Sequence, residues 1–333
     1  MSSNTCDSSF ALGSGRAAVL RGPYGEPYKV EDNASKIKRL GPFDVLVRLR
    51  ASGVCSGDIS SRDGGPPSPP EPLRSLVGGH EGVGTVLSLG SSVGQVSDIK
   101  VGDVVGLGWR HSSCNKCEYC RIGAENLCRN QVVNGIQTDG TFQEFISAPV
   151  QHVLPIPESL DHISAAPLLC GGGTVVAALR RVKLSVGQWV AISGAAGGLG
   201  HLAIQFAKSM GAFVVAIDGG SADKADFCLS LGADAFLDFT QVSDMPAAVT
   251  KASKGGVHAA IVLSANNLSY VSKGLSLHGQ RNATRKDILD ALELAAAGKI
   301  KVVTEVLQLK DINTALDRLK EGSVKGRLVL TIP

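Results

Sequence analysis

Four cysteines lie close together in the first half of the chain and have the spacing of metal ligands. They follow the pattern Cys-x2-Cys-x2-Cys-x7-Cys and are Cys114, Cys117, Cys120 and Cys128. Four thiolates within fifteen residues can close the tetrahedral shell of a structural zinc ion, which leaves no position open for chemistry. An iron–sulfur cluster and unrelated free thiols are the alternatives. Because the proline that follows the fourth cysteine in bacterial ferredoxins is absent, the pattern favours zinc.

Three further residues of the same ligand types lie in separate segments. They are Cys55, Cys170 and His80, which is set among glycines. A set of two cysteines and one histidine with one open position is typical of catalytic zinc. Asp58 stands three residues after Cys55 and can accept the other N–H of His80, and Glu81 is an alternative ligand or a nearby negative charge. Each thiol taken singly is more often a buried, inert cysteine, but the set beside the four cysteines favours a catalytic site.

A glycine-rich turn further along the chain can bind a dinucleotide. It follows the buried-strand pattern of residues 188–193 and leads into an apolar helix. Backbone N–H groups at such a helix start bind a pyrophosphate. Asp218 ends the next strand, where its carboxylate can hold both ribose hydroxyls and repel a 2′-phosphate, so we predict NAD rather than NADP. A glycine-rich turn of another α/β domain is the alternative. The turn residues are Gly194, Gly197, Gly198, Leu199 and Gly200.

Two different sequence patterns surround these groups. From Arg16 to about Pro157, short alternating segments such as residues 44–50 and 82–89 predict a β-rich, partly open barrel. From about Ile163, strands alternate with helices, which predicts an α/β fold with a doubly wound parallel sheet. We predict a zinc-binding catalytic domain over residues 1–162 and 299–333, and a dinucleotide-binding domain over residues 163–298.

The alternation of strands and helices falters after Ser264. One further strand, at residues 275–278, precedes a helix with Thr284 and Asp287 as a capping pair and Gly298 at its end. A complete dinucleotide-binding sheet has six strands, whereas this chain provides about five. We predict that one helix-plus-strand unit of roughly thirty residues is missing.

The composition limits the compartment and the partners. The chain has 333 residues, and its 33 Lys and Arg exceed its 30 Asp and Glu by three without forming a basic run. Nucleic acid and anionic membranes are therefore poor partners. The start of the chain lacks the features of a signal peptide, and the most apolar window, residues 163–179, is too short to span a bilayer. We expect a soluble cytoplasmic protein whose cysteines are ligands or free thiols.

Together these residues resemble the zinc-dependent medium-chain alcohol dehydrogenases, and in particular their yeast-type fungal branch. The likeness runs in order along nearly the whole chain, through residues 53–55, 78–84, 114–128, 167–170, 190–200, 217–220 and 326–327. It implies a GroES-like catalytic domain, a Rossmann-like cofactor domain, one catalytic zinc, one structural zinc and NAD(H).

The resemblance also implies roles for individual residues. Cys55, His80 and Cys170 would ligate the catalytic zinc, and the four clustered cysteines the structural one. The cofactor would be held by Gly198, Leu199, Asp218, Lys224 and Arg327, with Thr174 near the nicotinamide. Trp109 and Ser56 would lie at the substrate pocket, although a plain core role for Trp109 is equally compatible with the sequence.

The chain departs from this family in its proton relay as well as in its length. Members carry Ser or Thr two residues after the first zinc cysteine, where Gly57 stands here, and Asp63 lies near the place of the relay histidine. We expect a zinc- and NAD(H)-dependent oxidoreductase that interconverts a small alcohol and an aldehyde or ketone other than the ethanol pair. A non-redox zinc enzyme (lyase, cyclase or isomerase) and a non-catalytic zinc protein remain as alternatives, and a homo-oligomer is compatible with the sequence.

Overall fold

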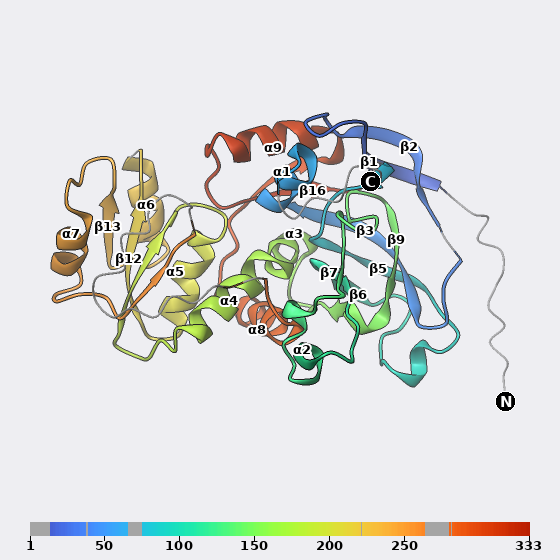
Figure 1. Ribbon diagram of the computed structural model, residues 1–333, viewed down its shortest axis with the longest axis horizontal. Helices are drawn as coiled ribbons and strands as arrows, with labels where there is room; N and C mark the ends of the chain where they lie inside the picture. Colours follow the sequence, from blue (N-terminus) through green and yellow to red (C-terminus); the bar gives the residue numbers. More distant parts are fainter. Residues whose placement is uncertain (1–13, 38, 66–74, 221, 264–279, 281) are drawn as a thin grey trace.

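The computed structural model describes the chain except residues 1–13, 38, 66–74, 221, 264–279 and 281. The molecule is elongated, with a β-rich half and a half in which helices cover a parallel sheet (Figure 1). Helices α4 (Gly171–Arg181) and α8 (Arg285–Ala296) pack together where the two halves meet. Within the described residues, no single helix has the length and apolar composition that a membrane span requires.

The β-rich half is built around the long strand β3 (Asp44–Val54), which pairs with three neighbours. These are β5 (Gly82–Leu89), β9 (Phe145–Pro149) and β16 (Arg327–Thr331). The sheet runs in the order β10-β6-β5-β3-β16-β15, with β6 at Val104–Leu107, β10 at Val153–Pro155 and β15 at Thr304–Gln308. Side chains on one face of β3, such as Val45, Val47 and Leu49, are fully buried. The C-terminal strands therefore complete the sheet that the N-terminal segment begins.

Smaller elements surround this sheet. A second sheet has the order β2-β1-β4, with β1 at Ser14–Arg21, β2 at Lys29–Lys36 and β4 at Ser75–Val77. The short pair β7 (Arg110–Ser112) and β8 (Val132–Val133) flanks the cysteine-rich segment, which carries α2 (Glu118–Arg121) and η2 (Glu125–Leu127). The other short helices are η1 (Val93–Gln95), α1 (Ser56–Asp63), η3 (Val150–His152), α3 (His162–Ala165), η4 (Ala166–Leu169), η6 (Leu309–Asp311) and α9 (Ile312–Lys320).

The other half is the predicted doubly wound parallel sheet. Its strands β11 (Trp189–Ser193), β12 (Phe213–Asp218), β13 (Ala235–Asp238) and β14 (Ala259–Ile261) are all parallel and lie in the order β13-β12-β11-β14. Helices α5 (Gly200–Ser209), α6 (Ala222–Ser230) and α7 (Met245–Ala252) connect them. The central strands are apolar on both faces because helices cover both sides. The order reverses at β11, which is where such sheets bind ligands.

The parallel sheet, whose half of the molecule is called the cofactor half below, has four strands within the described part of the chain. The fifth strand predicted at residues 275–278 lies outside the described residues. The capping pair predicted for the next helix is present, because the Thr284 N–H donates to Asp287 Oδ2 at 3.0 Å and the Asp287 N–H donates to Thr284 Oγ1 at 3.2 Å. Helix α8 then lies directly on α4, and a Cβ at Gly173 would stand 2.6 Å from Ile288 Cγ1. Glycine at this position therefore permits the close approach.

Candidate active site

The structure brings together the four residues proposed for the catalytic metal centre. One ligand atom each of Cys55, His80, Glu81 and Cys170 lies within 4.8 Å of the others. Cys55 directly follows β3, His80 and Glu81 precede β5, and Cys170 lies between η4 and α4. The group is thus assembled at the place where the β-rich half meets the helices of the cofactor half.

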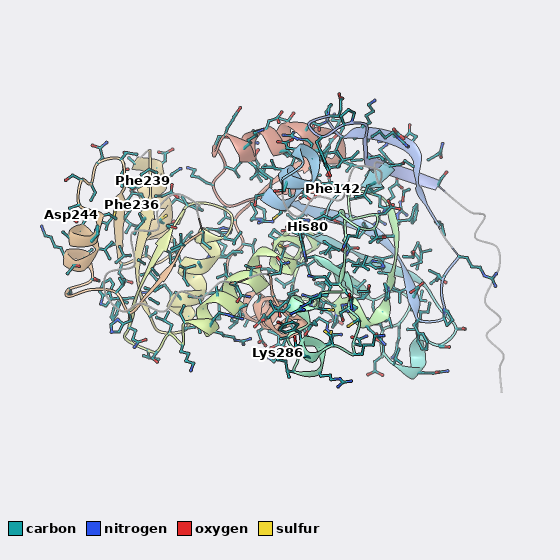
Figure 2. The ribbon with its side chains drawn as sticks, in the orientation of Figure 1. His80, Phe142, Phe236, Phe239, Asp244 and Lys286 are labelled. Atoms are coloured by element: carbon teal, nitrogen blue, oxygen red, sulfur yellow. The ribbon has the colours of Figure 1, made fainter. Side chains whose placement is uncertain are left out.

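Glycines and aromatic side chains fix the position of His80. Gly79 has φ +89°, and a Cβ there would lie 2.6 Å from Phe142 Cδ1, so only glycine fits this turn. Figure 2 shows His80 and Phe142 inside the β-rich half, and both are fully buried. The turn between β4 and β5 therefore directs the imidazole inward.

Asp58 orients His80 and ties it to Cys55. Its Oδ1 lies 3.1 Å from His80 Nδ1, and its Oδ2 accepts the Cys55 backbone N–H at 2.9 Å. This arrangement keeps a proton on Nδ1, so Nε2 is the ring nitrogen that a metal would bind. Within the described residues Nε2 is buried and has no hydrogen-bond partner.

The protonation of the two thiols fits a metal centre. Cys170 shares its proton with Cys55, which lowers the pKa of Cys55 well below its usual value and raises that of Cys170. Burial lowers the pKa of His80, but the charges of Asp58 and Cys55 raise it by more. A partnerless imidazole nitrogen beside a thiolate is the donor set that zinc takes, with protons released on binding. The residues present therefore fit a zinc ion.

Glu81 is held by Arg327 in a buried ion pair. The Nη2 of Arg327 donates to both carboxylate oxygens, and both side chains are buried. Burial raises the pKa of Glu81 to about 7, and the charge of Arg327 opposes that rise. Arg327 also reaches the cofactor turn, because a Cβ at Gly198 would stand 2.8 Å from its Cδ. Arg327 therefore connects the metal-ligand group to the glycine-rich turn.

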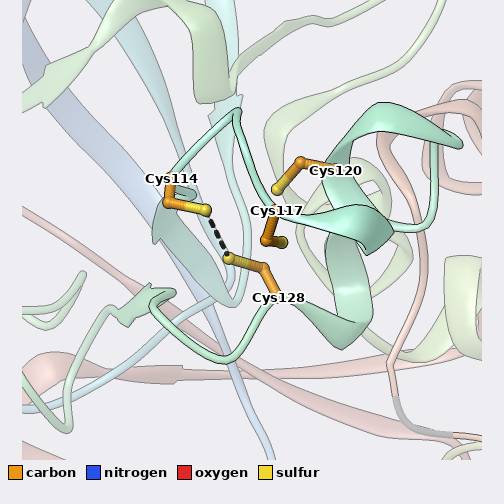
Figure 3. A group of neighbouring side chains, drawn as sticks. All are labelled: Cys114, Cys117, Cys120 and Cys128. Atoms are coloured by element: carbon orange, nitrogen blue, oxygen red, sulfur yellow. Dashed lines mark hydrogen bonds between the residues drawn. The ribbon is translucent and has the colours of Figure 1, made fainter.

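The four clustered cysteines form a second group. Their sulfurs lie within 4.8 Å of one another and are turned toward a common centre (Figure 3). The Sγ atoms of Cys114 and Cys128 are 3.6 Å apart, and all four thiols are free. Backbone N–H groups lower the pKa of Cys114 to about 6, whereas burial and the neighbouring thiols raise that of Cys120 to about 11. The lobe has a small core of Trp109, Val133 and Ile136, so a metal would be its main cross-link.

The glycine-rich turn has the geometry needed for a dinucleotide. Gly194 has φ +62°, and a Cβ at Gly200 would stand 2.2 Å from Gly194 O, so strand and helix meet too closely for any side chain there. Gly197, Gly198 and Leu199 form the loop between them, and α5 begins at Gly200. The loop therefore presents the N-terminus of α5 at the carboxyl end of β11.

Asp218 and Lys224 lie together beside this turn. Asp218 Oδ2 accepts the Ala196 N–H at 2.9 Å, and its Oδ1 accepts the Gly219 N–H at 2.8 Å and a proton of Lys224 Nζ at 3.0 Å. The carboxylate is thus fixed at the carboxyl end of β12, one strand away from the turn. This is the position from which an acidic residue holds the ribose hydroxyls.

A cleft opens beside Cys170 and contains Trp109 and Thr174. The Trp109 ring packs edge-on against His80, with centroids 4.7 Å apart, and a Cβ at Gly57 would stand 3.2 Å from both rings. Trp109 therefore occupies the space beside the position where a relay hydroxyl would stand. Ser56, by contrast, is exposed at the start of α1.

Comparison with known proteins shows the family to which the chain belongs. Residues 41–158 match the family described as alcohol dehydrogenase GroES-like domain, and residues 198–279 match zinc-binding dehydrogenase. An alcohol dehydrogenase of Geobacillus stearothermophilus is 37% identical, with 88% of this chain and 93% of the relative covered. One of Schizosaccharomyces pombe is 36% identical, with 95% of this chain and 97% of the relative covered. The chain belongs to the zinc-dependent medium-chain alcohol dehydrogenase family.

Membership makes this dehydrogenase an oxidoreductase of alcohols, and solved structures agree with the fold. The structure titled AibC superimposes with a TM-score of 0.87 at 29% identity and covers all of both chains. A structure titled NAD-dependent alcohol dehydrogenase gives a TM-score of 0.83 at 27% identity, covering 96% of this chain and all of the other. The predicted GroES-like and Rossmann-like architecture is confirmed.

The alignment also shows that the chain is shorter than one of its relatives. The alignment to the Schizosaccharomyces enzyme runs over 347 positions but covers 95% of 333 residues, which is about 316. The difference, 347 minus 316, means that about 31 residues of the relative are aligned with gaps in this dehydrogenase. This number matches one helix-plus-strand unit.

Two features of the site were not among the predicted residues. Arg110 follows Trp109 in the sequence, lines the cleft and is buried. The only sequence signal for it was a charged residue that stands beside an aromatic one in a strand pattern. His201 is buried beneath the glycine-rich turn, with Nδ1 3.2 Å from Gly197 O and Nε2 accepting the Val303 N–H at 3.3 Å. Asp63, which stands near the place of the relay histidine in the sequence, pairs with Arg62 at 2.7 Å and with Lys320 at 2.9 Å and so holds α1 on α9.

Proposed function

We propose that this dehydrogenase interconverts an alcohol and an aldehyde or ketone with NAD(H). One zinc ion would be bound by Cys55, His80 and Cys170, and a second by the four clustered cysteines. The observation that carries the proposal is the buried Nε2 of His80, which lies near two cysteine sulfurs and has no hydrogen-bond partner among the described residues. When bound, zinc supplies a Lewis acid to the reacting oxygen, and the nicotinamide accepts or supplies the hydride.

The residues of the chain would position both groups. Asp58 keeps the proton of His80 on Nδ1, so that the ligand nitrogen stays available. The N-terminus of α5 would receive the pyrophosphate, and Asp218 the ribose hydroxyls. A fixed carboxylate repels a 2′-phosphate, so NADH should bind more tightly than NADPH. Trp109 and Thr174 would form the walls between which the substrate lies.

Proton transfer would differ from that of relatives with a hydroxyl relay. Gly57 has no hydroxyl, and Asp63 is held in ion pairs on the far end of α1. The proton of the alcohol would therefore exchange directly with water at the mouth of the cleft. General acid–base assistance contributes about 10²- to 10⁴-fold, so we expect slow turnover of simple alcohols. The same observation favours a non-redox zinc reaction as the second candidate.

Cofactor binding and aldehyde-dependent NADH oxidation test the proposal. Protein with a known zinc content is titrated with NADH and with NADPH, and bound cofactor is followed by its fluorescence. We expect saturable binding that is tighter for NADH, followed by NADH oxidation when an aldehyde is added. Absence of NADH binding at millimolar concentration would refute the redox function. Substrate turnover that requires zinc but survives without nicotinamide would support the non-redox reaction instead.

A further inference from the structure

Two side chains that line the cleft beside the metal-ligand group each carry a buried N–H donor without an acceptor among the described residues. The donors are Trp109 Nε1 and Arg110 Nε. The two side chains are only 8% and 7% exposed, and both line the cleft together with Cys170 and Thr174. Buried donors are nearly always hydrogen-bonded in folded proteins. Two such donors in one cleft indicate an acceptor that arrives with a ligand.

Trp109 places one of these donors next to the reacting position. Its ring packs against the ring of His80 at an interplanar angle of 86°. Gly57 makes this packing possible, since a larger residue there would crowd both rings. A group that accepts a hydrogen bond from the indole is therefore a close neighbour of whatever binds at Cys55, His80 and Cys170.

Arg110 adds a positive charge that its neighbours do not fully balance. Its Nη2 donates to the Ala283 carbonyl at 3.1 Å, but its Nη1 lies 3.9 Å from Glu125 Oε1, too far for a hydrogen bond. The same Glu125 oxygen accepts the backbone N–H of Arg285 at 3.0 Å and its Nε at 3.2 Å. One carboxylate thus faces two guanidinium groups.

The other ionisable groups near Arg110 are the thiols of the cysteine lobe and His152. The thiols of Cys120 and Cys128 also lie near Arg110, and they belong to the structural metal group. His152 contributes no charge, because burial lowers its pKa to about 4 and its Nε2 accepts the Ser113 N–H at 3.1 Å. Arg110 can therefore serve an incoming anion while the lobe keeps its own charge balance.

We propose that Arg110 and Trp109 form a carboxylate-binding subsite, so that the preferred substrate carries a carboxylate near its reacting alcohol or carbonyl carbon. This inference rests on the proposed redox function and specifies its substrate class. One carboxylate oxygen accepts from Arg110 Nε–H and the other from Trp109 Nε1–H. A single negative charge with two acceptor oxygens matches two N–H donors, one of which belongs to a guanidinium.

A binding experiment tests the subsite without turnover. The chain has two tryptophans, Trp109 and Trp189, so the fluorescence of a Trp189→Phe variant reports on Trp109 alone. The zinc-loaded variant is titrated with butanoate, with butanamide and with inorganic phosphate. We expect saturable change with butanoate that is lost when Arg110→Gln is added, and a much weaker response to butanamide. A stronger response to phosphate than to butanoate, or equal responses to acid and amide, would overturn the carboxylate assignment.

A kinetic comparison tests the consequence for substrate choice. The quantity measured is the ratio of kcat/KM for 4-oxobutanoate to that for butanal, two aldehydes of equal chain length. Hydrogen bonds to charged groups support an expected fall of about ten- to a hundredfold in this ratio for Arg110→Gln, with a smaller fall for Trp109→Phe, which keeps an aromatic ring but lacks the N–H. Arg129→Gln, at an arginine whose side chain is 80% exposed on the same lobe, is the matched control and should leave the ratio unchanged.

The outcomes separate this inference from the proposed function. If Arg110→Gln lowers kcat/KM equally for both aldehydes, or releases the structural zinc, then Arg110 is a structural counter-charge and the inference is wrong. If the native protein oxidises NADH with neither aldehyde, the redox function fails, and the fluorescence titration still decides whether the subsite exists.

Discussion

Replacing Asp58 with Asn should weaken the catalytic zinc site without unfolding the protein. Asp58 accepts two N–H donors, from Cys55 and from His80 Nδ1. Asn has one acceptor oxygen, so if it keeps the bond to Cys55 its NH2 group faces His80. The imidazole must then carry its proton on Nε2, which is the nitrogen that zinc requires. Zinc binding would then require the proton to move from Nε2 to Nδ1, against the preference that Asn imposes.

The expected loss is about ten- to a hundredfold in zinc affinity, or about 1.4 to 2.7 kcal/mol. Competition with a graded series of chelators measures it, because the structural zinc provides an internal reference in the same chain. Asp244→Asn is the matched control: Asp244 also caps a helix, accepting the Ala247 N–H at 3.0 Å, but lies at the far end of the cofactor half (Figure 2). Unchanged affinity in Asp58→Asn, or an equal loss in both variants, would refute the reasoning.

Further predictions concern stability, the cofactor and the relay. Burial lowers the pKa of His201 to about 4, so the unfolded state binds more protons than the folded state between about pH 4 and 6.5. The free energy of unfolding should therefore be constant above pH 6.5 and fall below it. In urea unfolding, the native protein should lose about 2 kcal/mol more of this free energy between pH 7 and 5 than His201→Gln does. Cys117→Ser should lower the melting temperature and release one zinc, since the lobe core has only three residues; an unchanged melting curve would argue against a structural metal. Asp218→Ser should weaken NADH binding and reduce the preference over NADPH, measured by the same fluorescence titration. Gly57→Ser should not restore a relay but should lower activity, because its Cβ crowds His80 and Trp109; faster turnover of simple alcohols would contradict this.

Residue type and short-range spacing were sufficient to predict which side chains the structure brings together in two groups. The four clustered cysteines lie within one segment of fifteen residues, and Asp58 reaches His80 because it stands three residues after Cys55 at the start of a helix. Cys55, His80 and Cys170 are far apart in the chain, yet their uncommon ligand chemistry identified them. The parallel sheet followed from the alternation of apolar strands and amphipathic helices.

Contacts between distant segments could not be predicted in the same way. Arg327 pairs with Glu81 across 246 residues, and Arg110 donates to Ala283 across 173. Neither pairing leaves a local pattern, because each depends on how β16 and α8 pack against the first half of the chain. The contact of Gly57 with Trp109 likewise exists only after folding. The missing relay hydroxyl was visible in the sequence, but the ring that fills its place was not.

Counting zinc in a His80→Ala variant tests the central claim most directly. The native protein should hold two zinc ions per chain, one for each ligand group, and Cys228→Ala should hold the same number because Cys228 is the described cysteine outside both groups. His80→Ala should hold one zinc and should lose aldehyde-dependent NADH oxidation while remaining folded. Two zinc ions in His80→Ala, or only one in the native protein, would contradict the account.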